Sequence, residues 1–165
     1  MERRIAHQRP GSLFSLVGLA LLLTIPLPAL ASFTGPVVSI LDGDTIEVLR
    51  NHRAVRIRLN GIDCPEKRQA YGTKAAQRTA ELAFGKLVAV QTFDTDKYRR
   101  TIGDVILPDG RMLNEELVRE GFAWWYRKYA PGNVKLAQLE AEARQAKRNL
   151  WSHKNPIPPR VYRHR

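Results

Sequence analysis

The sequence contains a single cysteine, Cys64, among its 165 residues. One thiol excludes an intrachain disulfide and any metal site built from several thiolates, so the stability of the protein has to come from a packed core. Histidine is also scarce: the four copies are His7, His52, His153 and His164. They fall near the N-terminus, at an expected hairpin tip and in the C-terminal tail, and no catalytic pattern forms around them.

Acidic residues are few relative to basic ones. The chain has 16 Asp and Glu against 27 Lys and Arg, which gives a formal net charge of +11 and a pI near 10.3. Such an excess indicates a polyanionic partner, and nucleic acid, anionic lipid and an acidic wall polymer all satisfy it. The charge is equally compatible with a basic protein that is merely soluble. Apolar residues make up 44% of the chain, which argues against disorder of the whole molecule.

The first 31 residues have the pattern of a signal peptide. Three arginines among the first nine residues precede an apolar run at 13–25, and two prolines end that run just before Ala29 and Ala31. Small residues at these two positions fit recognition by signal peptidase, so we expect cleavage after Ala31 and a secreted or periplasmic protein. The alternative is an uncleaved membrane anchor, although the stretch is near the lower limit of ~18 residues for a spanning helix and is broken by two prolines.

The rest of the chain shows strand patterns first and helix patterns later. Alternation of apolar and polar residues at 54–62 predicts a strand that buries Val55, Ile57 and Leu59 and turns Arg56 and Arg58 to the opposite face. Strands are expected at 36–40, 45–49, 54–62, 87–93 and 101–107, and helices at 70–84, 113–120 and 134–149. Five short strands and three helices predict an α+β fold, in which a small closed β-barrel carries packed helices.

These elements place one folded domain at residues 32–151. The remaining tail, 152–165, contains three prolines and several basic residues. Such a composition is typical of a segment without a packed core, so the tail is expected to be disordered.

Two acidic clusters stand at expected strand ends, DGDT at 42–45 and DCPE at 63–66. Carboxylates at turns are commonly solvated turn formers, but two such clusters together offer the oxygen ligands that calcium prefers. Arg58 and Arg100 lie near expected strand ends as well. A planar, permanently charged guanidinium matches a phosphate, so these residue types together point to phosphoryl chemistry.

The order of these motifs resembles the staphylococcal nuclease (thermonuclease) family. The resemblance covers roughly residues 34–151 and rests on DGDT at 42–45, RLNGIDCPE at 58–66, DKYRR at 96–100, NEELVREG at 114–121 and NLW at 149–151. It implies a five-stranded OB-type barrel with three helices. Three departures are visible: Arg99 stands where the family commonly has glycine, Cys64 replaces the threonine of the best-known member, and the segment from Glu66 to Tyr71 is shorter than in that member.

The resemblance also implies residue roles. Asp44 and Asp63 would bind Ca²⁺ through their carboxylates and Cys64 through its backbone carbonyl, with Asp42 and Thr45 supporting the ion without touching it. The implied catalytic residues are Arg58 and Arg100, which would grip the phosphate, and Glu66, which would hold and activate the attacking water. The implied substrate contacts are Tyr98, Tyr129, Arg99 and Lys97.

We therefore expect a calcium-dependent, sequence-nonspecific phosphodiester hydrolase that acts on DNA and RNA and leaves 3′-phosphate ends. Stacking aromatics favour single-stranded or denatured substrates. A monomer without a stable protein partner is expected, with membrane contact only through the signal peptide. Two alternatives stay open: an OB-type module that binds nucleic acid without cleaving it, and a basic protein anchored at the membrane or wall.

Overall fold

A computed structural model describes residues 32–164, so the expected signal peptide at 1–31 lies outside the described residues. Five strands form a closed barrel in the order β1-β2-β3-β6-β5. They are β1 (Ser32–Asp42), β2 (Thr45–Arg50), β3 (Arg53–Leu59), β5 (Leu87–Thr95) and β6 (Thr101–Ile106). Neighbouring strands are antiparallel except β3 and β6, whose parallel pairing closes the barrel. The predicted five-stranded OB-type barrel is confirmed.

The hairpin between β2 and β3 shows how local sequence sets the barrel. Its two turn residues, Asn51 and His52, have φ angles of 48° and 61°. Positive φ at both central positions is the condition for the tight turn that matches the twist of paired strands. The resulting register pairs Ile46 with Ile57 and buries both side chains completely. Val55, expected in the core, is only partly buried.

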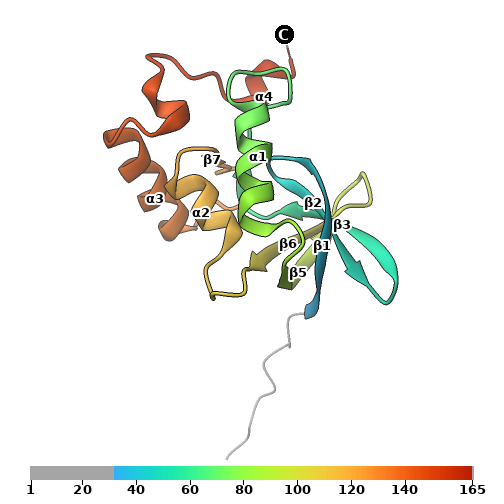
Figure 1. Ribbon diagram of the computed structural model, residues 1–165. Helices are drawn as coiled ribbons and strands as arrows, with labels where there is room; N and C mark the ends of the chain where they lie inside the picture. Colours follow the sequence, from blue (N-terminus) through green and yellow to red (C-terminus); the bar gives the residue numbers. More distant parts are fainter. Residues whose placement is uncertain (1–31, 165) are drawn as a thin grey trace, which may run out of the picture.

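The three predicted helices are present as α1 (Gly72–Ala83), α2 (Leu113–Arg119) and α3 (Val134–Gln145). In Figure 1, α1 lies against the barrel, and α2 and α3 lie on the side of α1 away from the strands. Helix α3 ends four residues earlier than expected, because Lys147 and Asn149 adopt positive φ angles of 51° and 41°. A short 3₁₀ helix, η1 (Asn149–Ser152), follows.

A small second sheet was not predicted. It pairs β4 (Ile62–Asp63) with β7 (Trp124–Trp125), so that Asp63 lies opposite Trp124. The Trp124 ring is buried and packs edge-on against Trp151, with 5.4 Å between the ring centroids. This sheet attaches the strand end that carries Asp63 to the helical half of the molecule.

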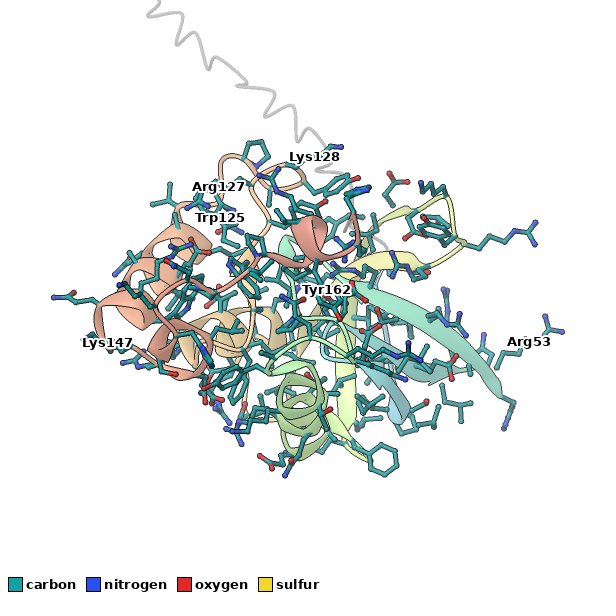
Figure 2. All side chains as sticks on the ribbon, turned by 90° about the horizontal axis from the view of Figure 1, so that it is seen from above. Arg53, Trp125, Arg127, Lys128, Lys147 and Tyr162 are labelled. Carbon is teal, nitrogen blue, oxygen red and sulfur yellow. The ribbon has the colours of Figure 1, made fainter. Side chains whose placement is uncertain are left out.

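The expectation of a disordered tail is wrong for residues 152–164. Pro158 is extended, and Pro159 is buried and begins a fourth helix, α4 (Pro159–Tyr162). A proline at the first helical position is favourable because its fixed φ suits the helix and no amide hydrogen is lost. Figure 1 shows α4 at the top of the molecule, above α1, and Tyr162 is labelled near the centre of the view from above in Figure 2. None of the helices within residues 32–164 is both long and apolar enough to cross a membrane.

Candidate active site

The loop between β1 and β2 is held tightly against the rest of the protein. A Cβ atom added at Gly43 would lie 2.8 Å from Cβ of Cys64 and 2.9 Å from Cβ of Ala75, so only glycine fits there. The hydroxyl of Thr79 in α1 donates to the carbonyl oxygen of Gly43 at 2.7 Å. These contacts fix the positions of Asp42 and Asp44 on either side of Gly43.

Arg58 joins the two acidic clusters of the sequence. Its Nη2 atom lies 3.1 Å from Oδ2 of Asp44 and 3.1 Å from Oδ1 of Asp63. Its Nη1 atom donates to the carbonyl oxygen of Leu59 at 2.8 Å. Arg58 leaves the barrel on the face opposite Ile57, as the alternation predicted, but its side chain is largely buried between the carboxylates rather than turned to solvent.

Burial and mutual repulsion perturb the carboxylates of the buried acidic cluster, which we define as Asp42, Asp44 and Asp63. Desolvation raises the pKa of Asp42 to about 6, and the charge of Asp44 adds to the rise. Desolvation and Asp44 likewise raise the pKa of Asp63 to about 6, although Arg58 and Arg163 oppose the shift. Desolvation lowers the pKa of Arg58, but the charges of Asp44 and Asp63 outweigh it and hold that pKa above its ordinary value.

This cluster is the place in the described structure that suits a hard cation. Within residues 32–164, no three His, Cys, Asp or Glu side chains are grouped so as to hold a metal by themselves. Calcium, however, also accepts backbone carbonyl and water oxygens in flexible geometry. Asp44 and Asp63 bring two carboxylates to one guanidinium nitrogen. The two carboxylates repel each other, as the raised pKa of Asp63 indicates, and a bound cation would reduce that repulsion.

Cys64 and Thr45 support Asp44. The backbone N–H of Cys64 donates to Oδ2 of Asp44 at 2.7 Å, and the hydroxyl of Thr45 donates to Oδ1 at 3.2 Å. The Cys64 side chain is buried, and desolvation followed by the charge of Asp44 raises the pKa of its thiol well above the ordinary value. A thiol held in its protonated form is a poor nucleophile, so Cys64 contributes through its backbone and its packing.

Glu66 lies in the loop that leads into α1. Its backbone N–H donates to the side-chain carbonyl oxygen of Gln69 at 3.2 Å, and its carbonyl oxygen accepts from the backbone N–H of Gln69 at 2.8 Å. Gly72 passes so close that an added Cβ would lie 1.9 Å from the Glu66 carbonyl oxygen. The loop backbone is therefore fixed, while the Glu66 carboxylate is half exposed and points to Arg163 of the tail.

An open cavity of about 530 Å³ adjoins these groups. Asp42 and Glu66 line it together with three cationic side chains and one aromatic ring, those of Lys67, Arg68, Arg163 and Tyr162. Carboxylates facing cations across one open space form a suitable setting for a phosphate ester and a bound cation.

Arg100 is not in direct contact with the acidic cluster. Its guanidinium pairs with Asp96, whose carboxylate also accepts from the backbone N–H groups of Tyr98 and Arg100. Thr101 of β6 lies opposite Ile57 of β3, so Arg100, one residue earlier, falls on the same face as Arg58.

The expected substrate contacts lie on the surface. The Tyr98 and Tyr129 rings are about two-thirds exposed, and cationic groups of Lys97 and Arg100 lie 4.9 Å and 5.5 Å from the Tyr98 centroid. Arg99 has a φ of 64°, the left-handed conformation that favours glycine. Within the described part of the chain, no hydrogen bond or ion pair joins Lys97, Tyr98, Arg99 or Tyr129 to the acidic cluster.

The sequence patterns do not reveal two residues that shape the site, Arg163 and Gln69. Arg163 belongs to the tail that is expected to be disordered, and Gln69 lies in a loop without a recognisable pattern. One signal for the tail is present: residues 156–162 (PIPPRVY) carry isoleucine, valine and tyrosine among the three prolines, a composition unlike that of a fully solvated segment.

Comparison with known proteins defines the class as a nuclease. The profile described as "Staphylococcal nuclease homologue" matches residues 56–153. An "Uncharacterized endonuclease" of Escherichia coli O157:H7 is 49% identical over 135 residues, which cover 82% of this chain and 88% of the relative. A "Micrococcal nuclease" of Shigella flexneri is 42% identical over 156 residues, covering 89% and 90%. The chain belongs to the staphylococcal nuclease family and is a hydrolase of nucleic acids.

Proposed function

We propose that this nuclease is calcium-dependent and sequence-nonspecific, hydrolyses DNA and RNA, and leaves 3′-phosphate ends. The observation that carries the proposal is the Arg58 guanidinium held between Asp44 and Asp63 at one end of the barrel. Two carboxylates for a cation and one arginine for a phosphate, brought together from three separate strands or loops, are suited to the cleavage of a phosphodiester.

Asp44 and Asp63 would hold the calcium ion through carboxylate oxygens and Cys64 through its backbone carbonyl, with Asp42 and Thr45 supporting them. When bound, the ion supplies Lewis-acid stabilisation of a non-bridging phosphate oxygen. Asp42 would act indirectly. Its carboxylate accepts a hydrogen bond from the backbone N–H of Asp44 at 3.1 Å and so orients Asp44.

The other steps belong to side chains of this chain. Glu66 orients a water and accepts its proton as the water oxygen attacks phosphorus. Arg58 and Arg100 bind the non-bridging oxygens, which gain charge in the transition state. The bond from phosphorus to O5′ breaks, and the departing oxygen takes a proton from solvent. The products are a 3′-phosphate and a 5′-hydroxyl.

Substrate breadth follows from the surface. Lys97, Tyr98, Arg99 and Tyr129 offer charges and exposed rings, groups that follow a phosphate backbone and stack on any base. We therefore extend the proposal to a preference for single-stranded or denatured substrates, to a monomeric enzyme and to export with cleavage after Ala31. Export would bring the enzyme to compartments where calcium is plentiful.

The proposal is tested with the purified protein, denatured DNA and RNA. Calcium should support cleavage, a chelator should abolish it, and end-labelling should find 3′-phosphates. Magnesium should support less activity, because it demands stricter octahedral geometry. Binding without cleavage in calcium would instead identify the non-catalytic module, and full activity in chelator would exclude the metal-dependent mechanism.

A further inference from the structure

The C-terminal segment brings a third arginine to the site. Nη1 of Arg163 lies 2.5 Å from Oε1 of Glu66, and Nη2 of the same side chain lies 3.1 Å from Oδ2 of Asp63. The two ends of one guanidinium therefore bind two different carboxylates, one in the Glu66 loop and one in β4. Arginine is suited to this role because its planar fork presents several donors in fixed directions.

The segment is attached to the same loop that carries Glu66. The Tyr162 hydroxyl donates to the backbone carbonyl of Arg68 at 3.3 Å, and the Gln69 side-chain amide donates to the carbonyl oxygen of Ile157. Gln69 also accepts from the backbone N–H of Glu66. The tail and the Glu66 loop therefore form one hydrogen-bonded unit, to which Tyr162, labelled in Figure 2, belongs.

The Glu66 carboxylate has one side-chain partner among the described residues, Arg163. Within residues 32–164, that carboxylate accepts a hydrogen bond from no other side chain, and 39% of the side chain is exposed. A half-exposed glutamate without a partner samples several rotamers, and a misplaced base loses much of its contribution to the rate. We propose that Arg163 is a positioning residue, which holds Glu66 in the orientation needed to direct water at the phosphate.

This inference rests on the proposed function, and the geometry favours positioning over blockage. Arg163 lines the cavity of about 530 Å³ and leaves it open. Nη1 of Arg163 binds Glu66 at 2.5 Å and reaches Oδ1 of Asp63 only at 3.5 Å, whereas the shorter contact with Asp63, at 3.1 Å, is made by Nη2. A cation that takes over Asp63 therefore displaces mainly the Nη2 contact and leaves the contact with Glu66 in place. The guanidinium also offsets part of the negative charge of the acidic cluster, which would otherwise repel an anionic strand.

The central test compares Arg163→Ala with Arg160→Ala, a matched loss of one positive charge in the same helix. Arg160 is exposed and forms no ion pair within residues 32–164. We expect Arg163→Ala to lower kcat ~10- to 100-fold and to leave KM within about threefold of wild type. A misoriented Glu66 loses only part of the rate acceleration that a general base contributes. Arg160→Ala should keep wild-type kinetics. Arg163→Lys should recover part of the loss, because an ammonium can bind Glu66 but cannot reproduce the fork.

A double-mutant cycle separates positioning from a merely structural role. In a Glu66→Gln background, Arg163→Ala should change kcat by less than about threefold, because its effect passes through Glu66. Single-turnover assays with long incubations measure the residual rates, and thermal unfolding confirms that each variant is folded. A loss of equal size in both backgrounds, or the same loss in Arg160→Ala, would overturn the proposal. So would a rise in kcat, which would identify the tail as an inhibitory latch.

Calcium binding without substrate gives a readout that does not depend on activity. Arg163 and a cation compete for Asp63, so Arg163→Ala should bind calcium ~3- to 10-fold more tightly in calorimetric titration. Weaker binding would mean that Arg163 builds the ion site instead of positioning Glu66, and would overturn the inference. A wild-type protein without calcium-dependent cleavage would refute the proposed function itself, whereas an active wild type with an equally active Arg163→Ala variant refutes only the inference.

Discussion

Arg58 and Arg100 have the same expected task in two different settings. Arg58 lies at the end of a barrel strand with 13% of its side chain exposed, between Asp44 and Asp63. Arg100 leaves the turn at residues 96–100 with 25% of its side chain exposed, and it pairs with Asp96 four residues away. The first contact joins segments distant in sequence, whereas the second is local.

The two arginines should therefore differ in their effect on stability, although both are expected to act in catalysis. Removing Arg58 leaves the buried Asp44 without its counter-charge and Asp63 with Arg163 alone, which is a large loss of stability as well as of function. Removing Arg100 breaks one partly exposed pair next to its own turn, and such pairs contribute little to stability. The contacts of Arg58 with Asp44 and Asp63 therefore contribute to the stability of the fold, whereas the contacts in the turn at 96–100 contribute little to it.

The largest expected effect comes from Arg58→Ala. In the absence of calcium, unfolding in urea should show a loss of about 3–5 kcal/mol, because Asp44 stays buried without its ion-pair partner and Asp63 keeps only Arg163. Calcium should restore part of this loss by binding the same carboxylates. The variant should also lose activity by ~10²–10³-fold or more, as expected when a transition-state donor is removed. Arg100→Ala should lose activity on the same scale, but no more than about 1 kcal/mol of stability.

Arg56→Ala is the control for that pair. Arg56 lies on the same strand face as Arg58 but is half exposed and pairs only with Glu47, so activity and stability should stay near wild type. Equal losses of stability in Arg58→Ala and Arg100→Ala would contradict the distinction between the two regions. Arg58→Ala activity within threefold of wild type would remove Arg58 from the mechanism.

A smaller effect is expected from Asp42→Asn, and it depends on pH. The pKa of Asp42 is raised to about 6, so the folded protein binds a proton more readily than the unfolded chain. Stability of the calcium-free protein should therefore fall as pH rises from about 4 to above 6. Asparagine removes the charge, so Asp42→Asn should be about 2 kcal/mol more stable than wild type at pH 7 and equal to it near pH 4.

Asp109→Asn should change the stability at pH 7 in the opposite direction to Asp42→Asn. The side-chain hydrogen bond from Arg111 lowers the pKa of Asp109, so its charged form stabilises the fold above the unfolded pKa. Asp109→Asn should be slightly less stable than wild type at pH 7. Urea unfolding in chelator across pH 4–8 measures both variants, and a loss of stability at pH 7 in Asp42→Asn would contradict the repulsion within the acidic cluster.

The smallest effect concerns the turn itself. Arg99 adopts a φ of 64°, so Arg99→Gly should raise stability by about 0.5–1 kcal/mol by relieving the left-handed strain. If Arg99 contacts the phosphate backbone of the substrate, the same variant should bind denatured DNA a few-fold more weakly. Its affinity for DNA should also depend less steeply on salt concentration. Lys97→Gly, in the same turn without positive φ, should lower stability. Stability unchanged or reduced in Arg99→Gly would show that the turn tolerates a side chain there.

Local patterns predicted much of the barrel. The alternation at 54–62 located β3 and put Ile57 and Leu59 in the core, and Asn51-His52 marked the hairpin tip, because period and turn preference are properties of a few neighbouring residues. Helix ends were less accurate. Lys147 is not glycine, so the usual signal for a left-handed residue after a helix was missing at the end of α3, although Asn149 is of a type that tolerates this conformation.

The candidate site was predictable by resemblance and only partly by pattern. DGDT at 42–45 and DCPE at 63–66 indicated carboxylates at strand ends, but not that Arg58 would lie within 3.1 Å of both clusters. The tail was misjudged because its prolines suggested disorder. In the folded protein, Pro159 is buried and the tail gains hydrogen bonds to the Glu66 loop, contacts that no window of the sequence contains.

By itself the sequence determined the basic charge, the order of strands and helices, and the residue types needed for phosphodiester cleavage. Only the tertiary structure decided which of those residues meet. The parallel pairing of β3 with β6, the small sheet of β4 and β7 and the return of α4 depend on burial between segments up to 100 residues apart. Burial also turns ordinary aspartates into a crowded cluster with raised pKa values, because the charged form loses its water.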